Sequence, residues 1–164
     1  MQMILLEILQ LLKLAILRTG LNKSDLGLGE ITKAKEEAEN KYKLLYNTSS
    51  DAIMTIEPPK WNFTAGNPAT LKMFNVKDEQ QLASLTPEDL SPVKQPNGHL
   101  SSVLAKKMIE KAMKEGSAYF EWIHKRYKGE SFPATILLSR VEEKGKIYLQ
   151  ATVREINKNN ENKK

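Results

Sequence analysis

The order of strands and helices in the sequence predicts an α+β domain with five antiparallel strands and helices on one face of the sheet. Two strands come first, several short helices and one longer helix follow, and three strands close the domain. The last two strands alternate apolar and polar residues, which predicts one buried and one wetter face. Lys128-Gly129 and Lys144-Gly145 supply the turns between the last three strands.

Residues 1–22 are predicted to form an amphipathic helix that dimerises. Met1–Thr19 is strongly apolar, but Glu7, Gln10 and Lys13 interrupt it at three-residue spacing. No apolar run therefore reaches the ~18 residues that a membrane-spanning helix needs. The wide apolar face has to be covered, and we expect a second copy of the chain, since symmetric dimers are the commonest assembly. Association with a membrane surface is the alternative, although interfacial helices favour more than one Lys in the polar stripe.

Residues 23–46 are predicted to hold a glycine-containing joint and a linker helix that runs from about Glu30 to Tyr46. Apolar residues on one side of this helix form a short a/d-like seam: Ile31, Ala34, Ala38 and Leu45. The seam either packs on the domain or pairs with a partner helix, and a solvated helix leading into the domain is an equal alternative. The polar tail, residues 157–164, is expected to be disordered.

Residues 47–156 are predicted to fold as one domain. Asp51–Glu57 reads as the first strand, and Pro58-Pro59 separates it from a short second strand at Lys60–Thr64. Asn67 is a good helix cap, and Pro68 suits the first helical position. The elements expected after this helix are a helix over Asp78–Ser84, a cap-then-proline helix start at Thr86–Asp89, a loop over Ser91–Leu100, a helix over Ser101–Glu115 that Gly116 ends, and strands over Ala118–Arg126, Ser131–Val141 and Lys146–Ile156.

Short motifs in this order resemble those of the PAS domain family, over about Tyr42 to Ile156. They are Asp51-Ala-Ile-Met-Thr-Ile, Asn67-Pro-Ala with Met73-Phe74, Thr86-Pro-Glu-Asp-Leu-Ser-Pro92, Phe120-Glu-Trp-Ile-His-Lys-Arg126, Gly129-Glu-Ser-Phe-Pro133 and Thr152-Val-Arg-Glu-Ile156. The chain looks like the sensory PAS domains of bacterial and archaeal histidine kinases and related signalling proteins. The resemblance implies the spatial strand order 2-1-5-4-3, a sheet curved around a small cavity that holds a cofactor or metabolite in some members, and flanking helices that often dimerise.

The parity of the strands, with Phe74 added from the helix that begins at Asn67, predicts which residues surround this cavity. The ten candidate ligand-binding residues are Met54, Ile56, Phe74, Phe120, Trp122, His124, Ala134, Ile136, Ala151 and Val153. His124 alternates in phase with Phe120 and Trp122, so it is expected to point inward as the main polar group. The resemblance adds that flavin-binding relatives carry a polar, ligand-touching residue at the equivalent position. The alternative is a core histidine whose ring is satisfied by the backbone or by a neighbouring side chain.

The residue types limit the chemistry of the domain. The chain has 164 residues and no cysteine, which excludes disulfides and the cysteine-dependent photochemistry of light-oxygen-voltage flavin domains. The sequence contains no nucleophilic triad, phosphate loop or paired-carboxylate motif and no cluster of metal ligands, so we expect neither an enzyme nor a metal site. His99 precedes the longer helix, from which haem-binding relatives usually draw the proximal ligand, but a surface histidine is the simpler interpretation. The sequence therefore does not identify a cofactor.

The charge pattern argues against nucleic acid as a partner. The net charge of +5 is spread among acids and partly carried by the tail, whereas a nucleic-acid site gathers Lys and Arg on one face. A basic chain without cysteine fits the cytoplasm. The sequence thus predicts a sensory or signal-relay module that binds a small ligand or a signalling partner and transmits through dimerising N-terminal helices. The alternative is a dimerisation or protein-interaction scaffold whose cavity is filled by its own side chains.

Overall fold

The computed structural model describes residues 28–156, and the chain divides after Thr48 into two compact units. The dimerisation helix expected over residues 1–22 and the tail at residues 157–164 lie outside the described residues. The first unit contributes helix α2 (Leu28–Thr48), which extends two residues further at each end than the sequence predicted. Within residues 28–156, no helix is both long and apolar enough to cross a bilayer.

Helix α2 carries mixed charges along its length. Glu30 lies in the first turn, where a negative charge favours the helix dipole, and Lys35 lies 3.8 Å from Glu39 one turn later. The two large apolar residues of the expected seam, Ile31 and Leu45, are exposed. Within the described residues, these two side chains therefore gain little from burial, and charge pairing and intrinsic propensity favour the helix.

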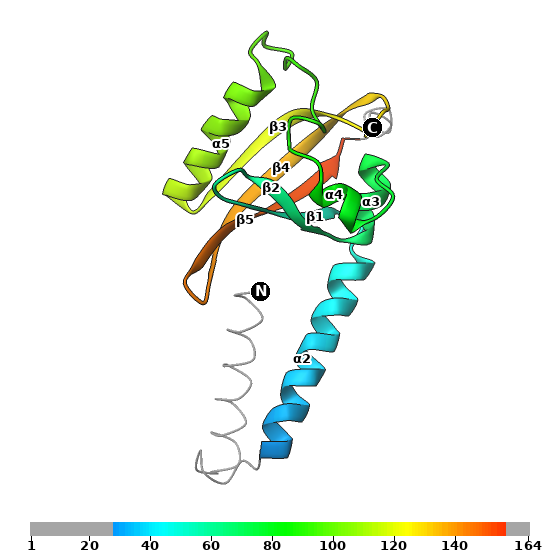
Figure 1. Ribbon diagram of the computed structural model, residues 1–164, viewed down its shortest axis with the longest axis vertical. Coiled ribbons are helices and arrows are strands. Elements are labelled where there is room, and N and C mark those ends of the chain that lie inside the picture. The colour runs from blue at the N-terminus through cyan, green and yellow to red at the C-terminus, as the bar shows by residue number, and fades with distance from the viewer. Residues whose placement is uncertain (1–27, 157–164) are drawn as a thin grey trace, which may run out of the picture. The chain divides into compact units, whose positions relative to one another are not determined.

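The second unit is the predicted α+β domain (Figure 1). Its elements are β1 (Ala52–Glu57), β2 (Asn62–Gly66), α3 (Pro68–Phe74), α4 (Glu79–Ala83), α5 (Ser101–Glu115), β3 (Ser117–Lys125), β4 (Ser131–Glu143) and β5 (Lys146–Glu155). All paired strands are antiparallel, and the sheet order is β2-β1-β5-β4-β3. The fold class and the strand order predicted from the sequence are therefore confirmed.

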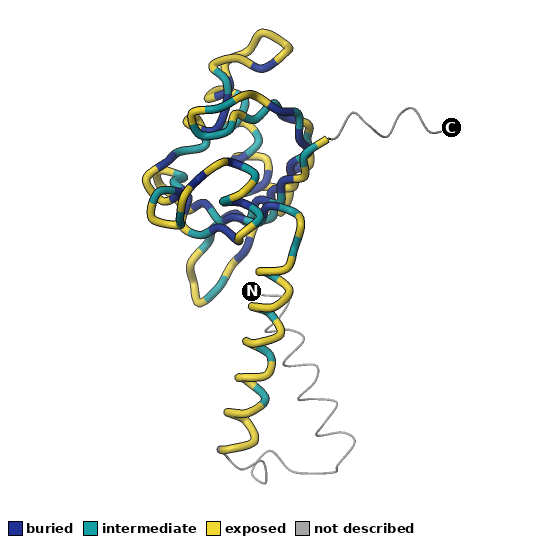
Figure 2. The backbone as a smooth tube through the Cα atoms, turned by 90° about the vertical axis from the view of Figure 1, so that its right-hand side faces the viewer, coloured by how far each residue is buried: buried dark blue, intermediate teal, exposed yellow. Residues whose placement is uncertain are grey.

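One face of the sheet forms the core together with the helices. Helices α3 and α4 contact the β1–β2 side, and α5 contacts β3, β4 and β5. Inner-face residues meet across the strands, as in the pairs Met54–Ala151 and Ile136–Val153. Figure 2 shows buried stretches of chain inside the domain, and most residues on the other face of β3, β4 and β5 are half-buried or exposed. Burial of this single apolar face is what holds sheet and helices together.

The helix ends follow the chemistry of their capping residues. Asn67 caps α3 by accepting the Thr70 N–H at 2.9 Å, and Asp78 caps α4 by accepting the Gln81 N–H at 2.8 Å. Gly116 ends α5 with a φ of 90°, a left-handed conformation that glycine adopts without steric cost. These caps determine where α3 and α4 begin and where α5 ends.

Two local expectations were wrong. The second strand begins at Asn62 instead of Lys60, because the Trp61 N–H donates to the Glu57 carbonyl at 2.8 Å and closes a tight turn that delays strand pairing. Thr86 starts a turn and not a helix. The Asp89 carboxylate accepts both the N–H and the hydroxyl of Thr86, and Pro92 disfavours helical backbone in the residue before it.

Candidate functional site

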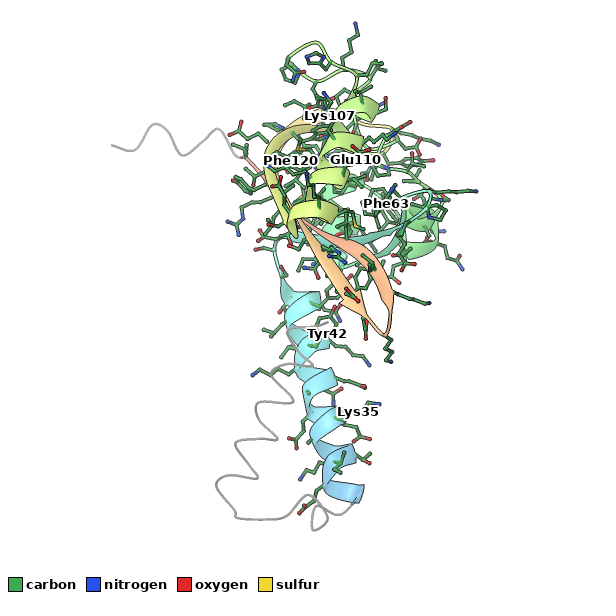
Figure 3. The ribbon with its side chains drawn as sticks, turned by 90° about the vertical axis from the view of Figure 1, so that its left-hand side faces the viewer. Lys35, Tyr42, Phe63, Lys107, Glu110 and Phe120 are labelled. Carbon is green, nitrogen blue, oxygen red and sulfur yellow. The ribbon has the colours of Figure 1, made fainter. Side chains whose placement is uncertain are left out.

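A cavity of about 70 Å³ lies between the inner face of the sheet and α5. Eight of the ten predicted residues line it: Met54, Ile56, Phe120, Trp122, His124, Ile136, Ala151 and Val153. Phe63 on β2 and Phe120 on β3 reach it from strands at the two edges of the sheet (Figure 3). The walls are mostly apolar, and the polar groups among the lining side chains are the Ser91 hydroxyl, the His124 imidazole and the indole N–H of Trp122.

Two predicted residues do not line the cavity. Phe74 is fully buried and packs edge-on against His124, with ring centroids 4.9 Å apart, so its ring fills the space beyond the imidazole. Ala134 is fully buried opposite Trp122 in the β3–β4 pairing. Strand parity identifies the inward direction of a residue, but it does not show which inward residues are covered by larger neighbours.

Six further residues line the cavity: Phe63, Pro87, Ser91, Ala105, Ile109 and Leu138. Leu138 continues the alternation of Ala134 and Ile136 and could have been included on that ground. Ile109 lies next to the apolar positions of the longer helix. Pro87 and Ser91 belong to a loop, and no periodic pattern in the sequence indicates which loop residues face inward.

His124 is the main polar group of this site. Its Nδ1 lies 3.1 Å from the carbonyl oxygen of Leu90. Because a carbonyl only accepts, the ring carries its proton on Nδ1 and presents Nε2 as an acceptor. Nε2 is shielded from solvent and has no hydrogen-bond partner among the described residues. A buried acceptor without a donor is unfavourable, so this atom is where a donor would bind best.

The protonation state of His124 follows from its surroundings. Burial lowers the pKa of His124 to about 4 from 6.5, and the hydrogen bond to Leu90 opposes this only in part. The aromatic rings of Phe74 and Phe132 flank the imidazole and offer it no counter-charge. The ring is therefore neutral near pH 7, and the site presents a lone pair instead of a positive charge.

The loop at residues 86–100 is tied to the edge strand β3 beside the cavity. The Trp122 indole N–H donates to Ser91 Oγ at 3.1 Å. The side-chain amide of buried Gln95 bonds both main-chain groups of Ile123, accepting its N–H at 2.8 Å and donating to its carbonyl at 3.0 Å. Gln95 thus takes the place of a neighbouring strand at this edge, and the Ser91–Trp122 hydrogen bond ties the loop to β3 at the cavity wall.

The cavity limits what the domain can hold in this conformation. Its volume of about 70 Å³ lies well below the roughly 300 Å³ at which ligand sites usually begin. His99, the candidate haem ligand, is exposed and does not line the cavity. Among residues 28–156, no group of three or more metal-ligating side chains comes together.

An antiparallel five-stranded sheet with helices on one face and a small internal cavity defines the class of domain. No family model and no curated protein sequence matches the chain. Solved structures do match it. A PAS domain from a two-component sensor histidine kinase is 20% identical with a TM-score of 0.59, covering 74% of this chain and 99% of that one. The domain therefore has the PAS fold.

Two other solved structures are similar. The PAS domain of an HTR-like protein from Haloarcula marismortui is 17% identical, with a TM-score of 0.57 and coverage of 76% of this chain and 97% of that one. A LOV protein from Rhodobacter sphaeroides is 18% identical, with a TM-score of 0.59 and coverage of 75% and 70%. At these identities the likeness concerns the fold.

Proposed function

We propose that this chain is a non-catalytic sensory or signal-relay module whose PAS domain binds a small ligand at His124. The observation that carries the proposal is the buried Nε2 acceptor, which has no partner in the described part of the chain. Native proteins rarely leave such an atom unsatisfied without a functional reason or a bound molecule. The PAS domains from signalling proteins that share this fold support a sensory role.

The output step of the proposal runs through protein contacts. We propose a cytoplasmic homodimer formed by the apolar sequence at residues 1–22, with a signalling protein as the recipient of the signal. The apolar composition of that sequence supports this, because a wide apolar face is stable only when covered. For a signal to be transmitted, ligand binding at His124 would have to favour one of two conformations of the protein over the other.

A second candidate function is favoured by the cavity volume. At about 70 Å³ the core is nearly filled by its own side chains, which suits a dimerisation or interaction scaffold that needs no ligand. Native mass spectrometry of the purified full chain, recorded together with its absorbance spectrum, separates the two. A bound small molecule or a chromophore supports the sensor, and a ligand-free dimer that binds no offered compound supports the scaffold.

A further inference from the structure

A groove of about 850 Å³ runs along α5, next to the cavity. Its lining comes from the turn after β1, the turn after α4 and one side of α5, which Glu110 marks in Figure 3. Small-molecule sites commonly have volumes of roughly 300–1,000 Å³. The groove therefore has the size of a ligand site, which the cavity alone does not.

The wall between groove and cavity is thin. Pro87, Ala105 and Ile109 line both spaces, so a single layer of side chains separates them. Ala105 is half-buried, and Ile109 is 9% exposed on the helix. A ligand that spans both spaces must displace these residues, and it must also reach Nε2 of His124, which is shielded in this conformation.

Trp61 lines the groove with an unusual backbone. Its φ is 58°, in the left-handed region, which is strained for a bulky residue. The turn holds it there through the Trp61 N–H bond to Glu57. Strain of this kind clusters at ligand-binding places, and here it keeps a large aromatic ring at the groove.

The charged groups of the groove favour an anion. Lys60, Lys106 and Lys114 line it against Glu88 and Glu110, which leaves a net charge of +1. None of these five side chains forms an ion pair within the described residues. The three ammonium groups are thus available to a carboxylate without breaking an existing pair.

We propose that groove and cavity form one ligand site in two compartments, and that its ligand is an amphiphilic carboxylate with a hydroxyl or N–H donor at its apolar end. The inference rests on the proposed function. The donor enters the cavity and bonds Nε2 of His124. The apolar body lies against Trp61 and Ile109, and the carboxylate remains among the groove lysines. Because only the donor end of such a ligand enters the cavity, the cavity can be smaller than the whole ligand.

The test uses 3-(4-hydroxyphenyl)propionate as the probe on the full chain. Calorimetry gives affinities, and imidazole nitrogen NMR reports Nε2 directly. Removal of the hydroxyl (3-phenylpropionate) or replacement of the carboxylate by an ammonium (4-hydroxyphenethylamine) should each weaken binding about tenfold, the equivalent of one hydrogen bond or ion pair. The variant His124→Leu should erase the preference for the hydroxyl.

The matched groove variants are two triple substitutions of surface lysines. Lys60→Gln, Lys106→Gln and Lys114→Gln together should erase the preference for the carboxylate. The control, with the same loss of charge outside the groove lining, carries Lys72→Gln, Lys77→Gln and Lys107→Gln and should keep that preference.

Several results overturn the two-compartment site. It fails if the carboxylate and the ammonium probe bind equally well, or if the two triple variants behave alike. 4-Methylphenol has the hydroxyl but no carboxylate to bind in the groove. It therefore separates this inference from the proposed function. If 4-methylphenol shifts the Nε2 resonance and the carboxylate adds no affinity, the cavity remains a ligand site and only the two-compartment site is wrong. If no probe shifts that resonance, both are wrong.

Discussion

The imidazole of His124 and the main chain of Lys125 share one acceptor, the carbonyl oxygen of Leu90. Nδ1 of His124 lies 3.1 Å from this oxygen, and the Lys125 N–H donates to it at 2.9 Å. Leu90 itself is buried and lies within the loop that Gln95 anchors to β3. A side chain that faces the cavity is thereby bonded to the same atom that joins this loop to the sheet edge, so a change at the imidazole acts directly on the loop.

Acid is expected to destabilise the domain through His124. Because burial lowers the pKa of His124 from 6.5 to about 4, the unfolded chain binds the proton more readily than the folded one. Above pH 6.5 His124 is neutral in the folded and the unfolded chain, so it does not contribute to the pH dependence of the free energy of unfolding. As the pH falls from 6.5 towards 4, the free energy of unfolding should drop by up to about 3 kcal/mol.

Urea unfolding between pH 7.5 and 4, with His124→Phe as the reference protein, measures this drop. The variant lacks the titrating ring and should show a smaller fall. Other groups titrate in both proteins alike, among them Asp51, whose pKa the hydrogen bonds from Arg154 hold low. Identical pH slopes in the two proteins would mean that the ring is solvated.

Removal of the Gln95 side chain should release the loop from β3. Gln95→Leu keeps the bulk but leaves both main-chain groups of Ile123 without their partner, which should cost about 1–3 kcal/mol. Hydrogen exchange at the Ile123 amide should become faster. Gln80→Leu, at an exposed position on α4, is the matched control and should change neither quantity. Unchanged protection of Ile123 in Gln95→Leu would show that the loop is held by other contacts.

The Asn67 side chain connects α3 to β1 and should be sensitive to truncation. Its Oδ1 accepts the Thr70 N–H and the Ile53 N–H, and its Nδ2 donates to the Asp51 carbonyl. Asn67→Ala removes a helix cap and leaves buried main-chain groups unpaired, so we expect a loss of about 3 kcal/mol in thermal or chemical unfolding. Asp78→Ala, which removes the cap of α4 with its bond to Gln81, should cost about 1 kcal/mol. Equal losses would mean that Asn67 acts only as a cap.

Much of the fold could be predicted because each element carries a local signal. The alternation of Ile136 and Leu138 marks the inner face of β4, and Gly116 marks the end of α5. The strand order needed the family resemblance, since the pairing of β1 with β5 joins segments almost a hundred residues apart. Sequence periodicity reports which way a residue faces, and it says nothing of which distant segment lies opposite.

The rest of the site depends on contacts that no local pattern encodes. The inward position of Ser91 follows from the Trp122 indole, 31 residues later in the chain. The left-handed backbone of Trp61 follows from the closure of the turn on Glu57. Phe74 was expected in the cavity wall, but its position against His124 is decided by the packing of two aromatic rings. Side-chain packing of this kind depends on contacts between distant segments, so no local sequence pattern predicts it.

Dimerisation through residues 1–22 gives a separate prediction. Sedimentation of the full chain should show a dimer at tens of micromolar, and a chain that starts at Lys23 should sediment as a monomer. Leu5→Glu, Leu9→Glu and Leu12→Glu together should dissociate the full chain, because each charge would be buried unpaired. A monomer already in the unmodified full chain contradicts the proposed dimer.

Two alanines on the inner face should respond differently to added volume, because one of them borders the cavity. Ala134 is fully buried and does not line the cavity, whereas Ala151 lines it. Ala134→Phe should overfill its surroundings and cost about 1–3 kcal/mol or more. Ala134→Val should be destabilising for the same reason, while Ala151→Val places its methyl groups in free space and should cost less than about 1 kcal/mol. Chemical unfolding of the two valine variants measures the difference. If Ala151→Val is as destabilising as Ala134→Val, the space beside Ala151 is not available to a ligand, and the cavity is a packed core.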